Sequence, residues 1–254
     1  MTEWNPEAYS QVSKLQQWLA EKSLASLTLR GDERVLDLGC GHGKISAAIA
    51  ARLPHGSVLG ADASHDMVAF AGRTFPPSQH PNLAFQVADA AHLGFDGEFD
   101  LVVSFNCLHW VRDQAAALRG IAAALAPEGR THLRLVARGS RTSLEAVIED
   151  TRRASQWASH FAGFETPYLH LTPHEYREVA ERSGLHVERL DVQQDAWDFG
   201  SRDAFSHFAT ATFVEWTRRI PPDRHDAFIA DVLDRYAPVG NIFTFYQMEV
   251  TLRR

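Results

Sequence analysis

The chain has 254 residues, of which 45% are hydrophobic, and a formal net charge of -7 at pH 7; this length suits one α/β domain with insertions, or a domain with a small cap. The acidic balance argues against a nucleic-acid partner or an anionic membrane surface, and no run reaches the ~18 apolar residues of a membrane span. Because Cys40 and Cys107 lack metal-ligand spacing and the first residues lack the basic and apolar parts of a secretory signal, we expect a reduced, cytoplasmic protein without a bound metal.

The first predicted element is a helix over residues 5–30. Pro6 suits a first helical turn, and apolar residues recur on one side of the helix. These apolar residues are Val12, Leu15, Leu19 and Leu27. The helix also carries large aromatic or polar side chains, and among them we expect Trp18 to pack on the sheet.

Residues 35–53 are typical of a buried strand, a glycine turn and the start of a helix. The strand is apolar at Val35, Leu36 and Leu38, and apolar residues then recur at helical spacing from residue 45 to residue 53. Between the strand and the helix, glycine occupies every second position of residues 39–43 (GCGHG). Glycine has no Cβ, so a ligand can approach the backbone closely, and the free N–H groups at the helix start lie just beyond.

This loop differs from the dinucleotide-binding fingerprint GxGxxG, whose third glycine would fall at Lys44. Asp37 stands two positions before the first glycine. A carboxylate there gives a phosphate-bearing cofactor no favourable contact, but it would attract an ammonium group. The loop therefore argues against an NAD-linked oxidoreductase and favours a cofactor that carries an ammonium group.

Carboxylates also follow the next two predicted strands. Residues 57–60 lead to Asp62, and residues 83–87 lead to Asp89. Ligands of open parallel sheets bind at the carboxyl ends of the strands. Asp62 could accept both hydroxyls of a ribose, and Asp89 could accept a hydrogen bond from an adenine amino group. Each could be a simple turn residue, but three acidic strand ends in succession indicate a binding site.

The fourth predicted strand, residues 99–105, is apolar enough to be covered on both faces. It leads into residues 106–111 (NCLHWV), at the same edge as the glycine loop. The remaining predictions are a helix over 115–125, a strand over 131–137, an irregular helical lid over 140–170, a helix over 172–183, a strand over 185–197, helices over 201–220 and 223–236, and a last, antiparallel strand over 242–252.

This pattern resembles the class I S-adenosylmethionine-dependent methyltransferases. Residues 37–43 (DLGCGHG) match the first motif of that family, and Asp62 and Asp89 match its ribose-binding and adenine-binding acids. Residues 125–129 (LAPEG) are similar to its LxPGG turn, with Glu128 in place of a glycine. The resemblance covers residues 5–137 well and the rest in outline.

The resemblance implies an α/β fold with a doubly wound, seven-stranded, mostly parallel sheet in the strand order 3-2-1-4-5-7-6. We expect a single methyltransferase domain over residues 1–254, with an N-terminal helical lid over 1–30 and helical insertions over 140–170 and 200–238 that shape the acceptor pocket. The implied cofactor is S-adenosyl-L-methionine, with S-adenosyl-L-homocysteine as product. The oligomeric state stays open, with a monomer favoured.

On this basis we assign site residues. The cofactor contacts expected from the resemblance are Tyr9, Gln16, Asp37, Gly39, Cys40, Gly41, Asp62, Ala63, Met67, Asp89, Ala90 and Asn106. The acceptor contacts expected are Trp4, Tyr9, His109, Trp110, Trp157 and Trp197. His109 is the candidate catalytic residue, as a base or as a donor that positions a substrate oxygen.

Two short stretches narrow the acceptor. Residues 4–9 (WNPEAY) are similar to the start of trans-aconitate methyltransferases, and residues 107–114 (CLHWVRDQ) are similar to juvenile hormone acid methyltransferases. The lid layout also resembles that of malonyl-carrier-protein methyltransferases. All three groups esterify a carboxylate, which implies O-methylation of a small-molecule acid. Candidates to bind such an anion are Lys14, Arg138, Arg141, Arg152 and Arg153.

Two alternatives stay open at this point. A carboxylate is ionised at neutral pH and needs no general base, whereas O- or N-methylation of a phenol, alcohol or heterocycle would require His109 to act as one. The second alternative is a protein that binds the cofactor without transferring a methyl group.

Overall fold

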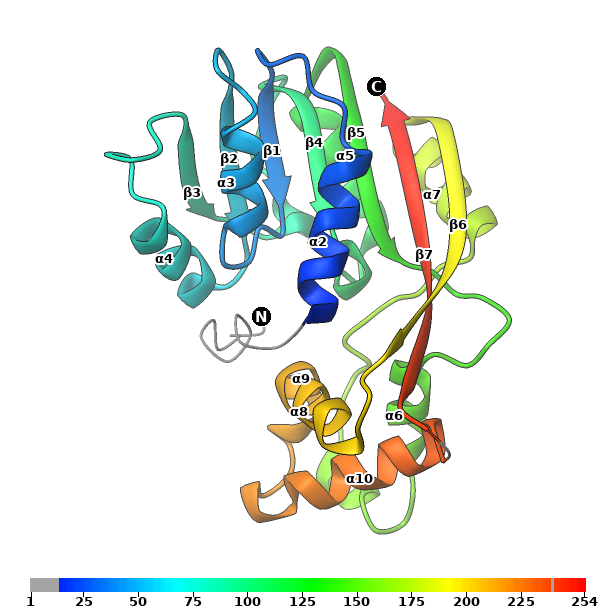
Figure 1. Cartoon of the computed structure of the whole chain (residues 1–254). Helices are drawn as coiled ribbons and strands as arrows, with labels where there is room; N and C mark the ends of the chain where they lie inside the picture. Colours follow the sequence, from blue (N-terminus) through cyan, green and yellow to red (C-terminus); the bar gives the residue numbers. More distant parts are fainter. Residues whose placement is uncertain (1–13, 239) are drawn as a thin grey trace.

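The computed structural model describes residues 14–238 and 240–254. Within them, one seven-stranded sheet has the order β3-β2-β1-β4-β5-β7-β6 (Figure 1). The strands are β1 (Arg34–Leu38), β2 (Ser57–Asp62), β3 (Leu83–Val87), β4 (Phe99–Phe105), β5 (Leu125–Val136), β6 (His186–Asp198) and β7 (Ile242–Arg253). All neighbouring pairs are parallel except those of β7, which is antiparallel to both β5 and β6. The predicted strand order is confirmed.

Helices cover both faces of the sheet. They are α2 (Lys14–Ser26), α3 (Lys44–Ala50), α4 (His65–Thr74), α5 (Gln114–Ala124), α6 (Leu144–Arg152), α7 (Pro173–Arg182), α8 (Arg202–Thr212), α9 (Val214–Thr217) and α10 (His225–Tyr236). One apolar cluster joins α2 and α3 to one face, and a second joins α5 and α7 to the other. Four short 3₁₀ turns complete the fold, η1 (Ala90–His92), η2 (Leu108–Trp110), η3 (Ala158–Phe161) and η4 (Pro222–Arg224). No helix in the described ranges is both long and apolar enough to cross a bilayer.

The alternation of apolar and polar residues accounts for this double winding. Val35 of β1 lies opposite Val58 of β2 and Leu101 of β4, and all three are buried. The next residue of β1, Leu36, packs on the opposite face, among residues of α5. Because successive side chains of a strand point to opposite faces, a strand that is apolar throughout must be covered on both sides.

Most predicted bounds agree with the structure, and three differ. The strand expected over 131–137 begins at Leu125, because Leu125 already pairs with Phe99 across an irregular register. The helix expected over 201–220 is two helices, α8 and α9, separated at Phe213. This break lets residues of both helices enter one aromatic cluster. Of the helix expected over 5–30, residues 5–13 lie outside the described ranges, and α2 ends at Ser26.

The antiparallel strands β6 and β7 carry a separate layer of helices. β6 and β7 pair from His186 opposite Arg253 to Asp198 opposite Ile242, and this ribbon runs beyond the carboxyl ends of the parallel strands (Figure 1). Helices α6, α8, α9 and α10, called the helical layer below, gather at its far end. Their core is an aromatic cluster that also takes in Leu15 and Leu19 of α2. Helix α2 therefore contacts both the sheet and the helical layer.

A buried carboxylate connects the parts of the helical layer. Glu149 of α6 is 4% exposed and accepts hydrogen bonds from Trp216 Nε1 at 2.8 Å, Thr166 Oγ1 at 2.8 Å and Arg152 Nε at 2.9 Å. Burial alone would raise the pKa of Glu149, but these hydrogen bonds outweigh burial and the pKa is lowered. Glu149 therefore stays ionised and holds α6, α9 and residue 166 together.

We expect Glu149→Gln to lower the free energy of unfolding by about 3 kcal/mol, because removing one member of a buried ion pair leaves the other charge uncompensated. Its neighbour Asp150, with a side chain 73% exposed, gives the matched control Asp150→Asn, expected to change stability by no more than about 0.5 kcal/mol. Since the pKa of Glu149 is lowered in the folded state, its contribution is present above the unfolded pKa and lost as the pH falls. Urea unfolding at pH 7 measures both variants, and equal effects would contradict this role of Glu149.

Candidate functional site

The glycine loop after β1 is held in a conformation that only glycine adopts easily. Gly39, Gly41 and Gly43 have φ of 81°, 52° and 81°, in the left-handed region. A Cβ on Gly39 would lie 2.2 Å from Cys107 Sγ, and one on Gly43 would lie 2.7 Å from the ring of Phe85. A Cβ on Gly41 would meet nothing within 4 Å. Gly39 and Gly43 are therefore required by packing, whereas Gly41 faces open space.

Asp37 lies beneath this loop rather than in a cavity wall. It is 2% exposed and accepts a hydrogen bond from Ser46 Oγ at 2.6 Å. Burial raises its pKa to about 6; the bond from Ser46 opposes the shift and the charge of Asp62 adds to it. At pH 7 the Asp37 carboxylate is mostly ionised, and it would act on a nearby cation through its charge.

A cavity of about 590 Å³ opens above the loop, at the carboxyl ends of β1, β2 and β4. Nine residues assigned from sequence line this cavity: Gly39, Gly41, Asp62, Ala63, Met67, Asp89, Ala90, Asn106 and Trp110. Its opposite wall includes Pro167 and an ion pair between Glu215 of α9 and Arg218, the residue that follows α9. The sheet edge and the helical layer therefore enclose it together.

The two strand-end carboxylates are fixed by backbone N–H groups. Asp62 accepts hydrogen bonds from Gly41 N and from Ser64 N, both at 2.9 Å. Asp89 accepts one from Ala91 N at 2.9 Å and lies 3.2 Å from His92 Nδ1. These hydrogen bonds fix both carboxylates at the cavity wall, where an ionised carboxylate acts only as an acceptor.

His109 and Trp110 lie in η2, just after β4, and line a small cavity of about 100 Å³. Asn106 and Trp110 line both this cavity and the larger one above the loop, so the two adjoin. His109 is 4% exposed, and burial, together with the neighbouring His170, holds the pKa of His109 well below its usual value. Val136 N donates to His109 Nδ1 at 3.4 Å, which leaves the proton of the neutral ring on Nε2.

Some assigned residues lie elsewhere. Trp157 is buried in the helical layer, where Nε1 donates to Asp231 Oδ2 at 2.8 Å, and Trp197 of β6 packs on Trp18. Neither lines the cavity above the glycine loop or the small cavity beside it. Cys40 packs behind the loop, and burial raises the pKa of its thiol. Trp4 and Tyr9 lie outside the described residues, as does the side chain of Gln16.

No local sequence pattern marks several residues of the cavity walls. Glu145 and Trp216 line the small cavity from the helical layer, and Gln247 lines it from β7. They lie 36 or more positions from His109 along the chain and belong to no short motif. The β6–β7 ribbon carries Gln247 and the helices between its strands, whereas Glu145 lies on α6, which follows β5 and packs in the same aromatic cluster. Among the residues that the structure describes, no group of His, Cys, Asp or Glu is arranged to hold a metal ion.

Comparison with known proteins identifies the family. A family described as "Methyltransferase domain" matches residues 35–129. The trans-aconitate 2-methyltransferase of Deinococcus radiodurans is 32% identical over 189 residues, which are 71% of this chain and 69% of that protein. The juvenile hormone acid O-methyltransferase of Bombyx mori is 25% identical over 206 residues, 80% of this chain and 73% of that protein.

A solved structure shares the fold. The YcgJ protein of Bacillus subtilis superposes with a TM-score of 0.65 at 18% identity, covering 93% of this chain and 97% of that one. The site described above fits S-adenosylmethionine on its own geometry. Gly41 leaves open space beside the loop, the Asp37 carboxylate lies beneath it, and the carboxylates of Asp62 and Asp89 line the cavity wall.

Replacing Gly41 with valine should reduce the affinity for S-adenosylmethionine more than about 100-fold, or about 2.7 kcal/mol, because the new side chain would fill the cavity. Gly39→Ala is the matched control. Both changes strain a left-handed backbone by about 1–2 kcal/mol. At Gly39 the added methyl group also collides with Cys107, so Gly39→Ala should lower the melting temperature more than Gly41→Val does. Calorimetric titration and thermal unfolding separate the two effects. Unchanged cofactor affinity in Gly41→Val would refute the placement of the cofactor.

Proposed function

The chain belongs to the class I S-adenosylmethionine-dependent methyltransferases, and on this premise we propose that it methylates the carboxylate of a small-molecule acid to a methyl ester. The observation that carries the proposal is the state of His109. Its Nδ1 is occupied by the N–H of Val136 and its pKa is well below the usual value. His109 is therefore a neutral hydrogen-bond donor, suited to a nucleophile that is already ionised.

The residues of the small cavity would hold a carboxylate in line. Asn106 Oδ1 accepts a hydrogen bond from Gln247 Nε2 at 3.0 Å, which leaves the Asn106 amide N–H groups for the substrate, beside His109 Nε2–H. When bound, the cofactor supplies an electrophilic methyl group on a sulfonium. The carboxylate oxygen held by Asn106 and His109 would take this methyl group as the carbon–sulfur bond breaks, with the electron pair left on sulfur and no proton transferred. Orientation of this kind contributes on the order of 7–11 kcal/mol in favourable cases.

The names of two relatives support an acid as acceptor, since one is a trans-aconitate methyltransferase and the other a juvenile hormone acid O-methyltransferase. We further propose that residues 140–170 and 200–238 shape the acceptor pocket of a single methyltransferase domain. Leu144, Phe208 and Trp216 from these segments line the small cavity. A phenol, alcohol or heterocycle is the weaker candidate, because its methylation requires a base. His109 could accept a proton from the acceptor only at Nε2, and that nitrogen already carries the proton of the neutral ring.

Incubation of the protein with S-adenosylmethionine and a panel of carboxylic acids, phenols and amines tests the proposal. We expect acids to gain the mass of one methylene, and we expect mild alkali to release the original acid, because esters hydrolyse under these conditions whereas aryl ethers and methylamines do not. Products from phenols or amines alone, stable to alkali, would overturn it.

With a carboxylic acid acceptor and saturating cofactor, kcat should be flat between about pH 6 and pH 9. The substrate, with a pKa of about 4, is ionised throughout, and His109, whose pKa is lowered by burial, becomes charged only well below its usual range. The cofactor must be saturating because Asp37 has a pKa of about 6 and becomes protonated at the acidic end of this range. Protonated Asp37 attracts the ammonium group of the cofactor less strongly, so the cofactor would bind more weakly there. A rise of kcat with pH inside this range would instead indicate a group that must lose a proton before methyl transfer.

A further inference from the structure

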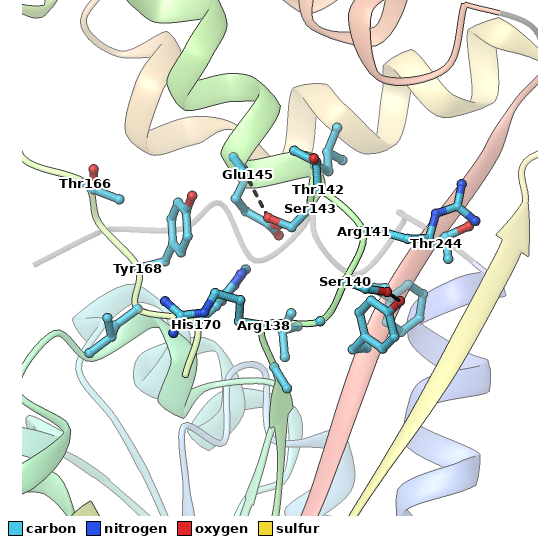
Figure 2. Close-up of a pocket in the computed structure, with 18 of the residues that line it drawn as sticks. Arg138, Ser140, Arg141, Thr142, Ser143, Glu145, Thr166, Tyr168, His170 and Thr244 are labelled. Carbon is cyan, nitrogen blue, oxygen red and sulfur yellow. Dashed lines mark hydrogen bonds between the residues drawn. The ribbon is translucent and has the colours of Figure 1, made fainter. Parts of the chain in front are cut away.

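A larger cavity adjoins the small one, away from the glycine loop. It has a volume of about 1060 Å³, and its walls come from the end of β5, residues 138–146, residues 166–170 and the start of β7 (Figure 2). It shares wall residues with the small cavity, namely Val136, Leu144, Glu145, Phe243 and Phe245. The small cavity has the volume of roughly three water molecules at ~30 Å³ each, whereas ligand pockets measure ~300–1,000 Å³. A carboxylate fits the small cavity, and the body of an acceptor belongs in the large one.

Most charged side chains of the large cavity already have partners. These pairs are Arg112 with Glu165, Arg138 with Glu175, and Asp113 with the N–H of Ala116. Arg141 is exposed at the rim. Glu145 is different, because it is half-buried at the junction of the two cavities and forms no hydrogen bond or ion pair with the described residues.

The surroundings of Glu145 favour a cation. Its side chain points from α6 into the cavity (Figure 2). Trp110 and Phe245 share the small-cavity wall with it, and Tyr168 shares the large-cavity wall. A place in the first turn of α6 suits an acid, but it does not account for a carboxylate that lies among aromatic rings without a partner in the described part of the chain. A carboxylate and aromatic rings together attract an ammonium group.

We propose that the acceptor is an amino acid in the broad sense, with an ammonium group that pairs with Glu145 in addition to the carboxylate that is methylated. The inference rests on the proposed carboxylate methylation and narrows it. A purely anionic acid would have to bring its carboxylate past Glu145 against like-charge repulsion. An ammonium group on the same molecule turns this repulsion into an attraction. The described side chains lining the small cavity include no lysine or arginine that could offset the repulsion between Glu145 and a substrate carboxylate.

Matched acids test the proposal with the full chain and S-adenosylmethionine. The pairs are ω-amino-alkanoates of three to eight carbons against unsubstituted alkanoates of equal length, and phenylalanine against 3-phenylpropanoate. In the wild-type protein, we expect kcat/KM for the preferred amino-bearing acid to exceed that of its partner at least about tenfold, or about 1.4 kcal/mol. Glu145→Gln should remove this preference, mainly through KM, and should raise kcat/KM for the unsubstituted acids, which no longer meet a like charge. Asp150→Asn on the exposed side of the same helix is the control and should retain the preference.

The outcomes separate the inference from the proposed function. Methylation of both acid classes with equal kcat/KM, or an equal effect of Glu145→Gln on both, would overturn the ammonium site and leave carboxylate methylation standing. No ester from any acid would overturn the proposed function itself. Thermal unfolding of Glu145→Gln checks that the variant folds, and the comparison of substrates in the wild-type protein tests the inference without any variant.

Discussion

The reversal of strand order between β1 and β4 is the constraint on which the site depends. The chain proceeds outward from β1 to β3 and then returns to the other side of β1, so the connections after β1 and β4 leave toward opposite faces of the sheet. A crevice opens where such connections diverge. Gly39 approaches Cys107 so closely that no Cβ fits between them. This contact sets the glycine loop directly against the end of β4, and the cofactor cavity, Asn106 and His109 all follow from it.

The second determinant of the site is the length of β6 and β7. A sheet whose strands all ended together would leave the crevice open to solvent. The β6–β7 ribbon extends past that edge and carries helices across it, and Glu149 holds those helices to one another through Trp216. Trp216 in turn lines the small cavity and packs edge-on against Trp110 at 6.2 Å. The stability of the helical layer and the shape of the small cavity are therefore linked through one indole ring.

Site residues could be predicted from the sequence where a local pattern marks them, and not where their place depends on contacts between distant segments. Asp62 and Asp89 were predictable because a carboxylate after a buried strand is a local pattern, and the sheet brings such strand ends to one edge. Glu145 and Gln247 were not predictable, since the place of each depends on packing between segments that lie far apart in the sequence. Trp157 illustrates the opposite case. Aromatic residues line pockets and fill cores alike, and its composition-based assignment to the acceptor could not anticipate its burial against Phe228.

Asn106 has a consequence for how this site can change over evolutionary time. It is the only non-glycine residue with a positive φ in the described ranges, at 56°, although asparagine tolerates this conformation better than most residues. Glycine would relieve the remaining strain and favour a more stable fold. It would also remove the amide that Gln247 orients between the two cavities. At this position, selection for stability and selection for activity act in opposite directions, which is the trade-off common to residues at functional sites.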